Sequence, residues 1–335
     1  MRNETRIAFN GFTKQVATIN SVGSVAEKFT VTPSVQQKLE IAIQESSAFL
    51  KKITILGVDE KDGEAIKVGV GSTVAGRTDT TQTARNPRNV SALNNDTYSC
   101  IKTDFDTAVS YALLDAWAKF PNFQALLSGA IVERQALDRI MIGFNGTSAA
   151  ATTNLAANPL LQDVNIGWLE HIRADAPARV MDEGAAPGTI TVGPAGDYKN
   201  LDALVYDAYQ TLLDPWFRTD GDLVAVVGRE LLHDKLFPLV SNPEAPTEIL
   251  AADIVRSQRR LGGLPAVSVP YFPANKVLIT RLDNLSIYWQ QSARRRTIVD
   301  NAKRDRIENY ESSNDAYVVE DYGLAALVEN IDIVD

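Results

Sequence analysis

Apolar residues recur along this chain at two different spacings, and the spacings separate helical from extended stretches. Between about residues 33 and 52 they keep the 3.6-residue period of a helix, and Thr32-Pro33 supplies a typical helix start. A longer helical pattern covers 122–145 and stops at Asn145-Gly146. At 1.5 Å per residue that helix would be roughly 33 Å long. We therefore predict that it forms the spine of a domain.

The apolar period changes to two between residues 53 and 111, which predicts a long two-stranded excursion. Alternation on both sides of Lys61–Glu64 indicates a hairpin, and it returns after a polar stretch at 71–97. A two-stranded ribbon is only marginally stable by itself in water. Neither this ribbon nor the N-terminal segment has an obvious core of its own. We expect both to pack on a surface supplied from elsewhere, such as another copy of the chain.

From about residue 198 the pattern alternates between helices and short strands. A helix is expected over 201–212 and a buried strand over 223–227, followed by helices near 229–237 and 244–258. Strands are expected from 266 to 290, and strand-like composition resumes after residue 294. The spine helix and this second compact stretch together predict two domains, which agrees with a length of 335 residues.

Composition excludes several classes of function. Hydrophobic residues make up 45% of the chain, enough for a folded core, but no run of about 18 apolar residues predicts a membrane span. The polar start lacks the apolar core of a signal peptide, so the chain is expected to stay in the compartment where it is made. Lys+Arg number 33 against 42 Asp+Glu, for a net charge of −9, which is unfavourable for general nucleic-acid binding.

Candidate catalytic groups are scarce. Cys100 is the only cysteine, and His171 and His233 are the only histidines, so any Ser-His or Cys-His unit must use one of those two. Asp104 and Asp106 share one face of a predicted strand, and paired carboxylates can perform acid–base chemistry. Lys102 on that same face favours a solvated or intersubunit surface instead. No cofactor or metal motif is present.

Several strings of residues, in this order along the chain, resemble one family. They include Phe29-Thr-Val-Thr-Pro-Ser34, Gly143-Phe-Asn-Gly146, Leu264-Pro-Ala-Val-Ser-Val-Pro-Tyr-Phe-Pro273 and Val318-Val-Glu-Asp-Tyr322. From its first residues almost to its last, the chain is similar to the major capsid proteins of Peduovirus-type tailed bacteriophages. The resemblance implies an α+β chain with the Hong Kong 97 capsid fold. Its parts would be an N-terminal arm (1–52), an E-loop hairpin (53–111), a P domain (112–197, with the spine helix 122–145), an A domain (198–290) and a return to the P domain (291–335).

The resemblance also implies a function without catalysis or cofactors. The chain would assemble with itself into pentamers and hexamers of an icosahedral head shell around double-stranded DNA, in the cytoplasm of a bacterial host. Its partners would be a portal protein and an internal scaffolding protein that carries a protease. That protease would remove an N-terminal segment, and the linker near Phe29-Thr30 offers a natural accessible bond.

Charged residues are the candidates for contacts between subunits. Arg77, Arg85 and Arg88 lie at the expected tip of the hairpin, and salt bridges to acidic patches on neighbours would suit them. The other candidates are Asp104, Asp106, Arg294, Arg295 and Arg296. Two alternatives stay open at this point: a soluble α/β enzyme with an unrecognised carboxylate site, and a different ring-forming phage structural protein.

Overall fold

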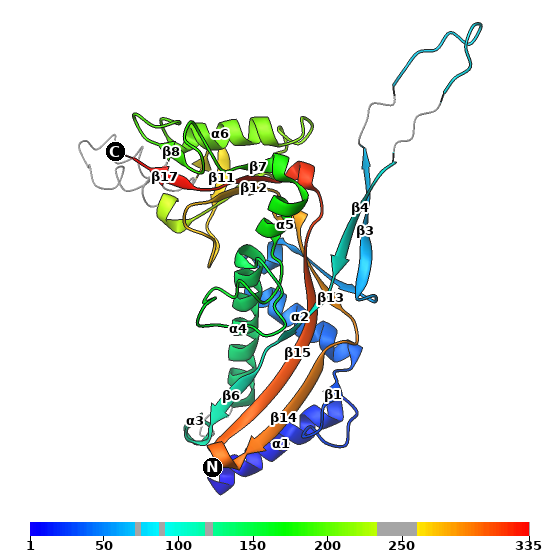
Figure 1. The fold of residues 1–335 in the computed structure, drawn as a ribbon. Helices are drawn as coiled ribbons and strands as arrows, with labels where there is room; N and C mark the ends of the chain where they lie inside the picture. The colour runs from blue at the N-terminus through cyan, green and yellow to red at the C-terminus, as the bar shows by residue number, and fades with distance from the viewer. Residues whose placement is uncertain (71–74, 87–90, 118–122, 233–259, 335) are drawn as a thin grey trace, which may run out of the picture.

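The chain forms a long body of two lobes, from which a slender hairpin stands away (Figure 1). The computed structural model describes residues 1–70, 75–86, 91–117, 123–232 and 260–334. None of the described helices is both long and apolar enough to cross a membrane. The helices are α1 (Asn3–Ile19), α2 (Pro33–Ser46), α3 (Tyr111–Trp117), α4 (Phe123–Asn145), α5 (Trp168–Asp175) and α6 (Leu201–Leu212).

The lower lobe in Figure 1 is built on a seven-stranded sheet. Its main path runs β1 (Phe29–Thr30), β14 (Arg295–Asn301), β15 (Arg306–Val319), β13 (Leu285–Gln290) and β2 (Thr54–Val58). Two further strands, β5 (Ile101–Asp104) and β6 (Thr107–Ser110), pair with the long β15. Helix α4 runs beside β15, which confirms the predicted spine helix from residue 123 onward.

The N-terminal helix α1 lies on the lower lobe of its own chain (Figure 1). Phe9 of α1 is buried in a cluster that includes Leu114, Ile298 and Ile307. As predicted, α1 packs on a surface from outside its own segment, but the same chain supplies that surface rather than another copy. Its apolar stripe finds its partners about 290 residues further along the chain, a distance that local pattern cannot bridge.

Helix α5 starts where the backbone comes very close to the end of α4. A Cβ atom on Gly143 would lie 2.3 Å from the ring of Trp168, and one on Gly167 would lie 2.5 Å from the carbonyl oxygen of Gly143. Both positions therefore need glycine, because any side chain would force the two helices apart. The contact seats Trp168, which is fully buried, in the main core against Phe49, Phe144 and Tyr317.

The upper lobe contains a six-stranded sheet with apolar side chains on both faces. Its order is β10 (Arg260–Leu261), β11 (Leu264–Val267), β9 (Val224–Val227), β12 (Val277–Thr280), β16 (Ala326–Val328) and β7 (Val180–Met181). Alternate residues face different cores: Leu278 belongs to the main core, and Val277 and Ile279 belong to a second core with α6. Burial on both faces explains why β9, β12 and β16 are almost continuously apolar in sequence. A smaller sheet joins β8 (Ile190–Val192) to β17 (Ile331–Ile333).

The projecting hairpin consists of β3 (Asp62–Val70) and β4 (Ser91–Ser99), paired antiparallel along their full length. It is shorter than the ribbon predicted over 53–111. β2 pairs in parallel with β13, and the segments after β4 pair with β15. Alternation correctly predicted strands here, but it carries no information about which strand a distant partner will be.

The other predicted elements differ from the structure in smaller ways. The helix expected over 33–52 ends at Ser46, and a 3-10 turn, η1 (Leu50–Lys52), follows it. Four further 3-10 turns are η2 (Pro177–Arg179), η3 (Leu282–Asn284), η4 (Ala302–Arg304) and η5 (Tyr322–Leu324). The predicted helices at 229–237 and 244–258 lie wholly or mostly outside the described residues, as do His233 and Arg88.

Candidate assembly interfaces

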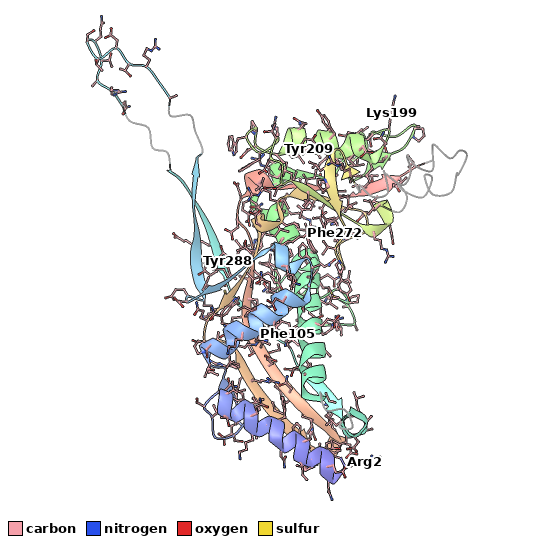
Figure 2. All side chains as sticks on the ribbon, turned by 180° about the vertical axis from the view of Figure 1, so that it is seen from behind. Arg2, Phe105, Lys199, Tyr209, Phe272 and Tyr288 are labelled. Atoms are coloured by element: carbon pink, nitrogen blue, oxygen red, sulfur yellow. The ribbon has the colours of Figure 1, made fainter. Side chains whose placement is uncertain are left out.

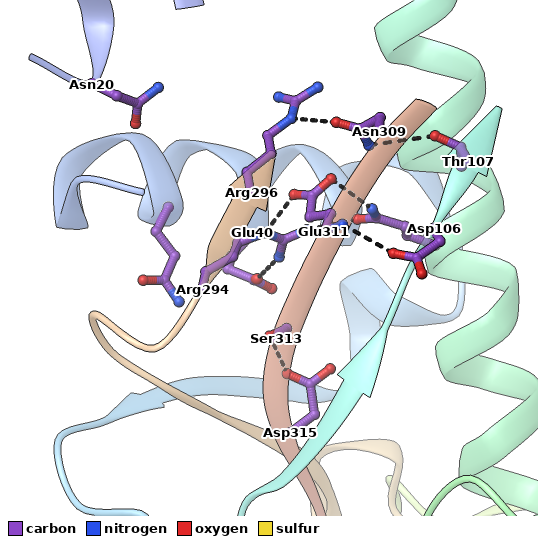
Figure 3. A network of polar contacts seen from close by, with 12 residues as sticks. Asn20, Glu40, Asp106, Thr107, Arg294, Arg296, Asn309, Glu311, Ser313 and Asp315 are labelled. Atoms are coloured by element: carbon purple, nitrogen blue, oxygen red, sulfur yellow. Dashed lines mark hydrogen bonds and ion pairs between the residues drawn. The ribbon is translucent and has the colours of Figure 1, made fainter. Parts of the chain in front are cut away.

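A buried network of charges fastens the second helix of the N-terminal segment to the lower lobe. Glu40 of α2 accepts hydrogen bonds from both Arg139 of α4 and Arg294, with a distance of 2.7 Å from Arg294 Nη1 to Glu40 Oε1. Figure 3 shows Arg294 reaching between Glu40 and Glu311. Arg139 also bonds Asp315 of β15. All five side chains are at most 4% exposed, so the network belongs to the interior of the chain.

Arginines beside Glu40 and Glu311 lower the pKa values of these two carboxylates. Burial alone would raise the pKa of Glu40, but the charges of Arg139 and Arg294 outweigh it and hold the pKa below its usual value of 4.5. Burial would also raise the pKa of Glu311, but the charges of Arg294 and Arg296 outweigh it, so this pKa is lowered too. Because each buried charge has an opposite partner, the network joins α2, α4 and the sheet into one unit.

The arginine triplet divides between the two faces of the sheet. Arg294 is fully buried and bonded within its own chain, which corrects its prediction as an intersubunit contact. Arg296, on the same face, is half-buried; it donates from Nε to Asn309 Oδ1 at 2.6 Å, and burial lowers its pKa. Arg295 points to the other face and is exposed. Strand alternation explains the division, because neighbouring residues face opposite sides.

Asp104 and Asp106 both lie on the exposed surface, but each already has a contact in the chain. Lys102 Nζ lies 2.6 Å from Asp104 Oδ1. Asp106 accepts the backbone N–H of Glu311 at 3.3 Å. Burial raises the pKa of Asp106, and the nearby charge of Asp104 adds to the effect. Among the described residues, no group of three His, Cys, Asp or Glu is placed to hold a metal ion.

The remaining reactive side chains have structural surroundings. Cys100 is fully buried, and burial raises the pKa of its thiol to about 12, so it carries almost no thiolate at neutral pH. His171 Nδ1 lies 3.1 Å from Asp175 Oδ2, an oxygen that also accepts the hydroxyl of Tyr322. No serine or cysteine nucleophile is bonded to this histidine among the described residues. These contacts give no support to the carboxylate or histidine enzyme alternative.

The cationic side chains at the tip of the hairpin are exposed to solvent. Arg77 and Arg85 are both exposed, and neither has an ion pair or hydrogen bond with the described residues. Figure 2 shows the described side chains of this tip well away from both lobes. The structure therefore agrees with the sequence in leaving the tip without packing partners among the described residues, although Arg88 lies outside them.

Phe29 and Thr30 do not lie in an open linker. They form β1, which pairs with β14 through Phe29↔Arg296 and Thr30↔Arg295, and the Phe29 side chain is buried. The Phe29–Thr30 bond is therefore less open than the sequence predicts, although Thr30 is exposed, and its cleavage stays a prediction. The exposed stretch ends just before it: Ala26, Glu27 and Lys28 are exposed and lie outside any helix or strand.

Solved structures with a similar arrangement define the class of protein. A chain of the satellite phage P4 procapsid, from a structure that includes the size determination (Sid) protein, is 47% identical to this chain. It superposes with a TM-score of 0.83, over 100% of this chain and 99% of that one. A capsid chain of cyanophage A-1(L) shares the fold at 17% identity and a TM-score of 0.52, over 93% and 96%. The chain therefore has the capsid fold of the Hong Kong 97 type.

Curated relatives then identify the particular family. The capsid protein of Escherichia phage P2 is 49% identical over 344 residues, covering 100% of this chain and 96% of the relative. The major capsid protein of Serratia phage KSP20 is 43% identical, covering 99% and 97%. The family described as phage major capsid protein, P2 family, matches residues 8–331. The chain belongs to this family and is a major capsid protein of a tailed phage, which confirms the resemblance.

Proposed function

We propose that this capsid protein forms pentamers and hexamers that close into an icosahedral head shell around double-stranded DNA in the cytoplasm of a bacterial host. The observation that carries the proposal is the β3–β4 hairpin, which extends from the lower lobe with an exposed, cationic tip. A protein that maintains such a projection needs a neighbour to cover it, because a lone two-stranded ribbon is only marginally stable. The chain's role is then structural, without a catalytic step.

The parts that the family resemblance implies can be assigned to the two lobes and the hairpin. The P domain (112–197 and 291–335) would supply most of the lower lobe, and the A domain (198–290) most of the upper lobe. The predicted bounds and the lobes do not coincide fully: β7, β8, β16 and β17 belong to the upper lobe, and β13 belongs to the sheet of the lower lobe. Residues 1–52 would be the N-terminal arm, and the hairpin within 53–111 would be the E-loop. The two helices of the arm are held to the lower lobe in different ways: α2 by the buried charges around Glu40, and α1 by the apolar cluster around Phe9.

Interfaces between subunits would use the charged residues that remain exposed. Arg77 and Arg85 of the hairpin tip and Arg295 of the open sheet face are the cationic candidates, and Arg88 stays a candidate from sequence. Asp104 and Asp106 would take part only by exchanging their present contacts. Each surface ion pair contributes little alone, about 0–1 kcal/mol. Many weak contacts repeated around a closed shell can nevertheless hold it together.

Partners other than the chain itself would act on the arm and on the interior of the shell. A scaffolding protein with a protease would find its accessible bonds in the exposed stretch that ends at Lys28 rather than inside β1. A portal protein would replace subunits at one vertex. The net charge of −9 suits a lining that encloses DNA without binding it everywhere or reading its sequence.

Excising the hairpin tests the proposal. Residues 65–96 are replaced by Asn-Gly, a turn that joins the paired residues Glu64 and Thr97. We expect a folded subunit whose melting temperature stays within a few degrees of the wild type, because the two lobes keep their cores. We also expect no shells in electron micrographs of the co-expressed head proteins. Shells of normal number and size from this variant would contradict the proposal.

A further inference from the structure

A hollow of about 450 Å³ opens between the base of the hairpin and the lower lobe. Its wall is largely apolar and combines side chains from the hairpin and from β15. The residues that form this wall include Tyr98, Ile101, Ala316, Val318 and Tyr322. The aromatic rings of Tyr98 and Tyr288 meet edge to face behind it, at a centroid distance of 5.1 Å. The hollow is thus a firm apolar surface at one end of the hairpin.

The rim of this hollow is acidic. Asp62 and Glu64 line it from β3, and both are exposed. Asp59 and Glu60 lie on the turn just before β3 and are also exposed. Burial is the largest cause that raises the pKa of the Tyr98 hydroxyl, and the neighbouring Cys100, Glu60, Asp59 and Asp62 add to it. Glu64 has no hydrogen bond or ion pair with the described residues, so its carboxylate is available to a partner.

The opposite end of the same hairpin carries the complementary charge. Residues 75–86 contain Arg77 and Arg85, which are exposed and unpaired among the described residues, together with several threonines. The single acid of this stretch, Asp79, already accepts hydrogen bonds from the backbone and hydroxyl of Thr81. Long arginine side chains can lay their methylene groups on apolar or aromatic surface while their guanidinium groups reach carboxylates.

We propose that the hairpin tip of one copy, residues 75–86, docks in the hollow at the hairpin base of a second copy. The inference rests on the proposed shell function and names the surface that receives the tip. Arg77 and Arg85 would pair with Asp62 and Glu64 while their stems lie on Tyr98 and the neighbouring apolar wall. Because the two complementary surfaces lie at opposite ends of one element, the contact is head-to-tail. Repetition of such a contact by a rotation that closes generates a ring.

Charge exchange between the two surfaces tests this contact. The variants are R77E/R85E at the tip, D62K/E64K at the base, and the fourfold combination. Like charges brought together across an interface cost several kcal/mol. Each double variant should therefore lower the yield of shells at least about tenfold, and the combination should restore it to within about threefold of the wild type. A combination no better than the double variants would overturn the inference.

A matched control separates this local contact from a change of total charge. The variant D182K/E183K makes the same charge change as D62K/E64K, at two exposed positions of the upper lobe. We expect it to leave the yield of shells within about threefold of the wild type, because it adds no like charge at the proposed contact. Equal losses of shell yield from D62K/E64K and D182K/E183K would overturn the inference. Melting curves of the unassembled subunits check that every variant folds.

Engineered cysteines give a second test that does not depend on assembly yield. In assembled shells, E64C together with T83C should form disulfides between subunits, since a disulfide needs Cβ atoms about 4 Å apart. Non-reducing gels should then show a ladder of covalent oligomers. The pair E183C and T83C is the control and should give monomers. Shells of the E64C/T83C variant that yield only monomers would overturn the inference but leave the shell function standing; wild-type protein that forms no shells would contradict the shell function itself.

Discussion

Arg139 shows how a charged side chain can belong to the core of a capsid subunit. Its guanidinium is fully buried between Glu40 of α2 and Asp315 of β15. These residues lie 99 and 176 positions away in the sequence. In the sequence the arginine lies inside the helix predicted over 122–145, and nothing near it predicts its partners. The neighbouring Arg294 was misjudged for the same reason, because an arginine triplet looks uniform until the strand assigns alternate residues to opposite faces.

Replacing Arg139 should destabilise the subunit strongly. In R139M, Glu40 and Asp315 would each lose a buried cationic partner, and broken buried pairs of this kind typically cost about 3–5 kcal/mol. The free energy of unfolding, measured in denaturant, should fall by that amount. Arg134→Ala is the control on the same helix. Arg134 is 53% exposed, and among the described residues its partners are Asp138 and Tyr271, so its loss should cost about 0.5 kcal/mol or less. Equal losses of unfolding free energy in the two variants would contradict a large contribution of the buried network to stability.

The same network predicts how stability depends on pH. Glu40 and Glu311 have pKa values lowered below the usual 4.5, so their folded forms release protons more readily than the unfolded chain. Such groups stabilise the fold above the unfolded pKa and lose that contribution as pH falls through the folded pKa. Unfolding free energy should therefore decline as pH decreases below about 4.5. In E40Q the unfolding free energy should fall less steeply with decreasing pH. An unchanged pH dependence would show that Glu40 does not contribute to it.

Among the elements, those with strong internal periodicity were predicted well and those defined by distant pairing were not. The spine helix was expected over 122–145 and the described α4 covers Phe123–Asn145. Alternation predicts that β2 is half of a hairpin, but its partner β13 lies more than 200 residues further on. β1 was read as a linker because two residues carry no usable period. The free tip of the hairpin was predictable because its sequence has few apolar residues to bury.

The position of β1 predicts which bonds of the arm a protease can reach. Chymotrypsin prefers aromatic residues, but Phe29 is buried in β1 and paired with β14. In native subunits, limited digestion should leave the Phe29–Thr30 bond intact. Trypsin should cut after Lys28, which is exposed and precedes the strand. Mass spectrometry of the fragments distinguishes the two sites, and digestion above the melting temperature is the control in which both should be cut. Rapid native cleavage after Phe29 would contradict the observed pairing of β1.

At the scale of the whole molecule, the two lobes share the six-stranded sheet. Leu278 packs into the main core while its neighbours Val277 and Ile279 pack into the core with α6. Length and composition predicted two domains but could not show this connection, which depends on strands that are distant in sequence. Both cores therefore lose a wall if the sheet separates, and we infer that the lobes unfold together.

Substitutions on opposite faces of β12 test this coupling. L278A removes packing from the main core and I279A removes it from the other, each at a cost of about 2–5 kcal/mol. Calorimetry of the unassembled subunit should show one transition in the wild type and in both variants, moved to lower temperature in each. A variant whose profile splits into two transitions, with only one of them moved, would contradict the coupling.

The shared sheet also limits where a shell can vary its curvature. In the proposed shell of pentamers and hexamers, the same chain would meet its neighbours at different angles, five around some axes and six around others. A sheet packed on both faces resists bending, because any shift would open gaps in two cores at once. The two lobes should then move as one rigid body. Differences of angle would be taken up by the hairpin, which projects from the body, and by the exposed linker that joins α1 to β1.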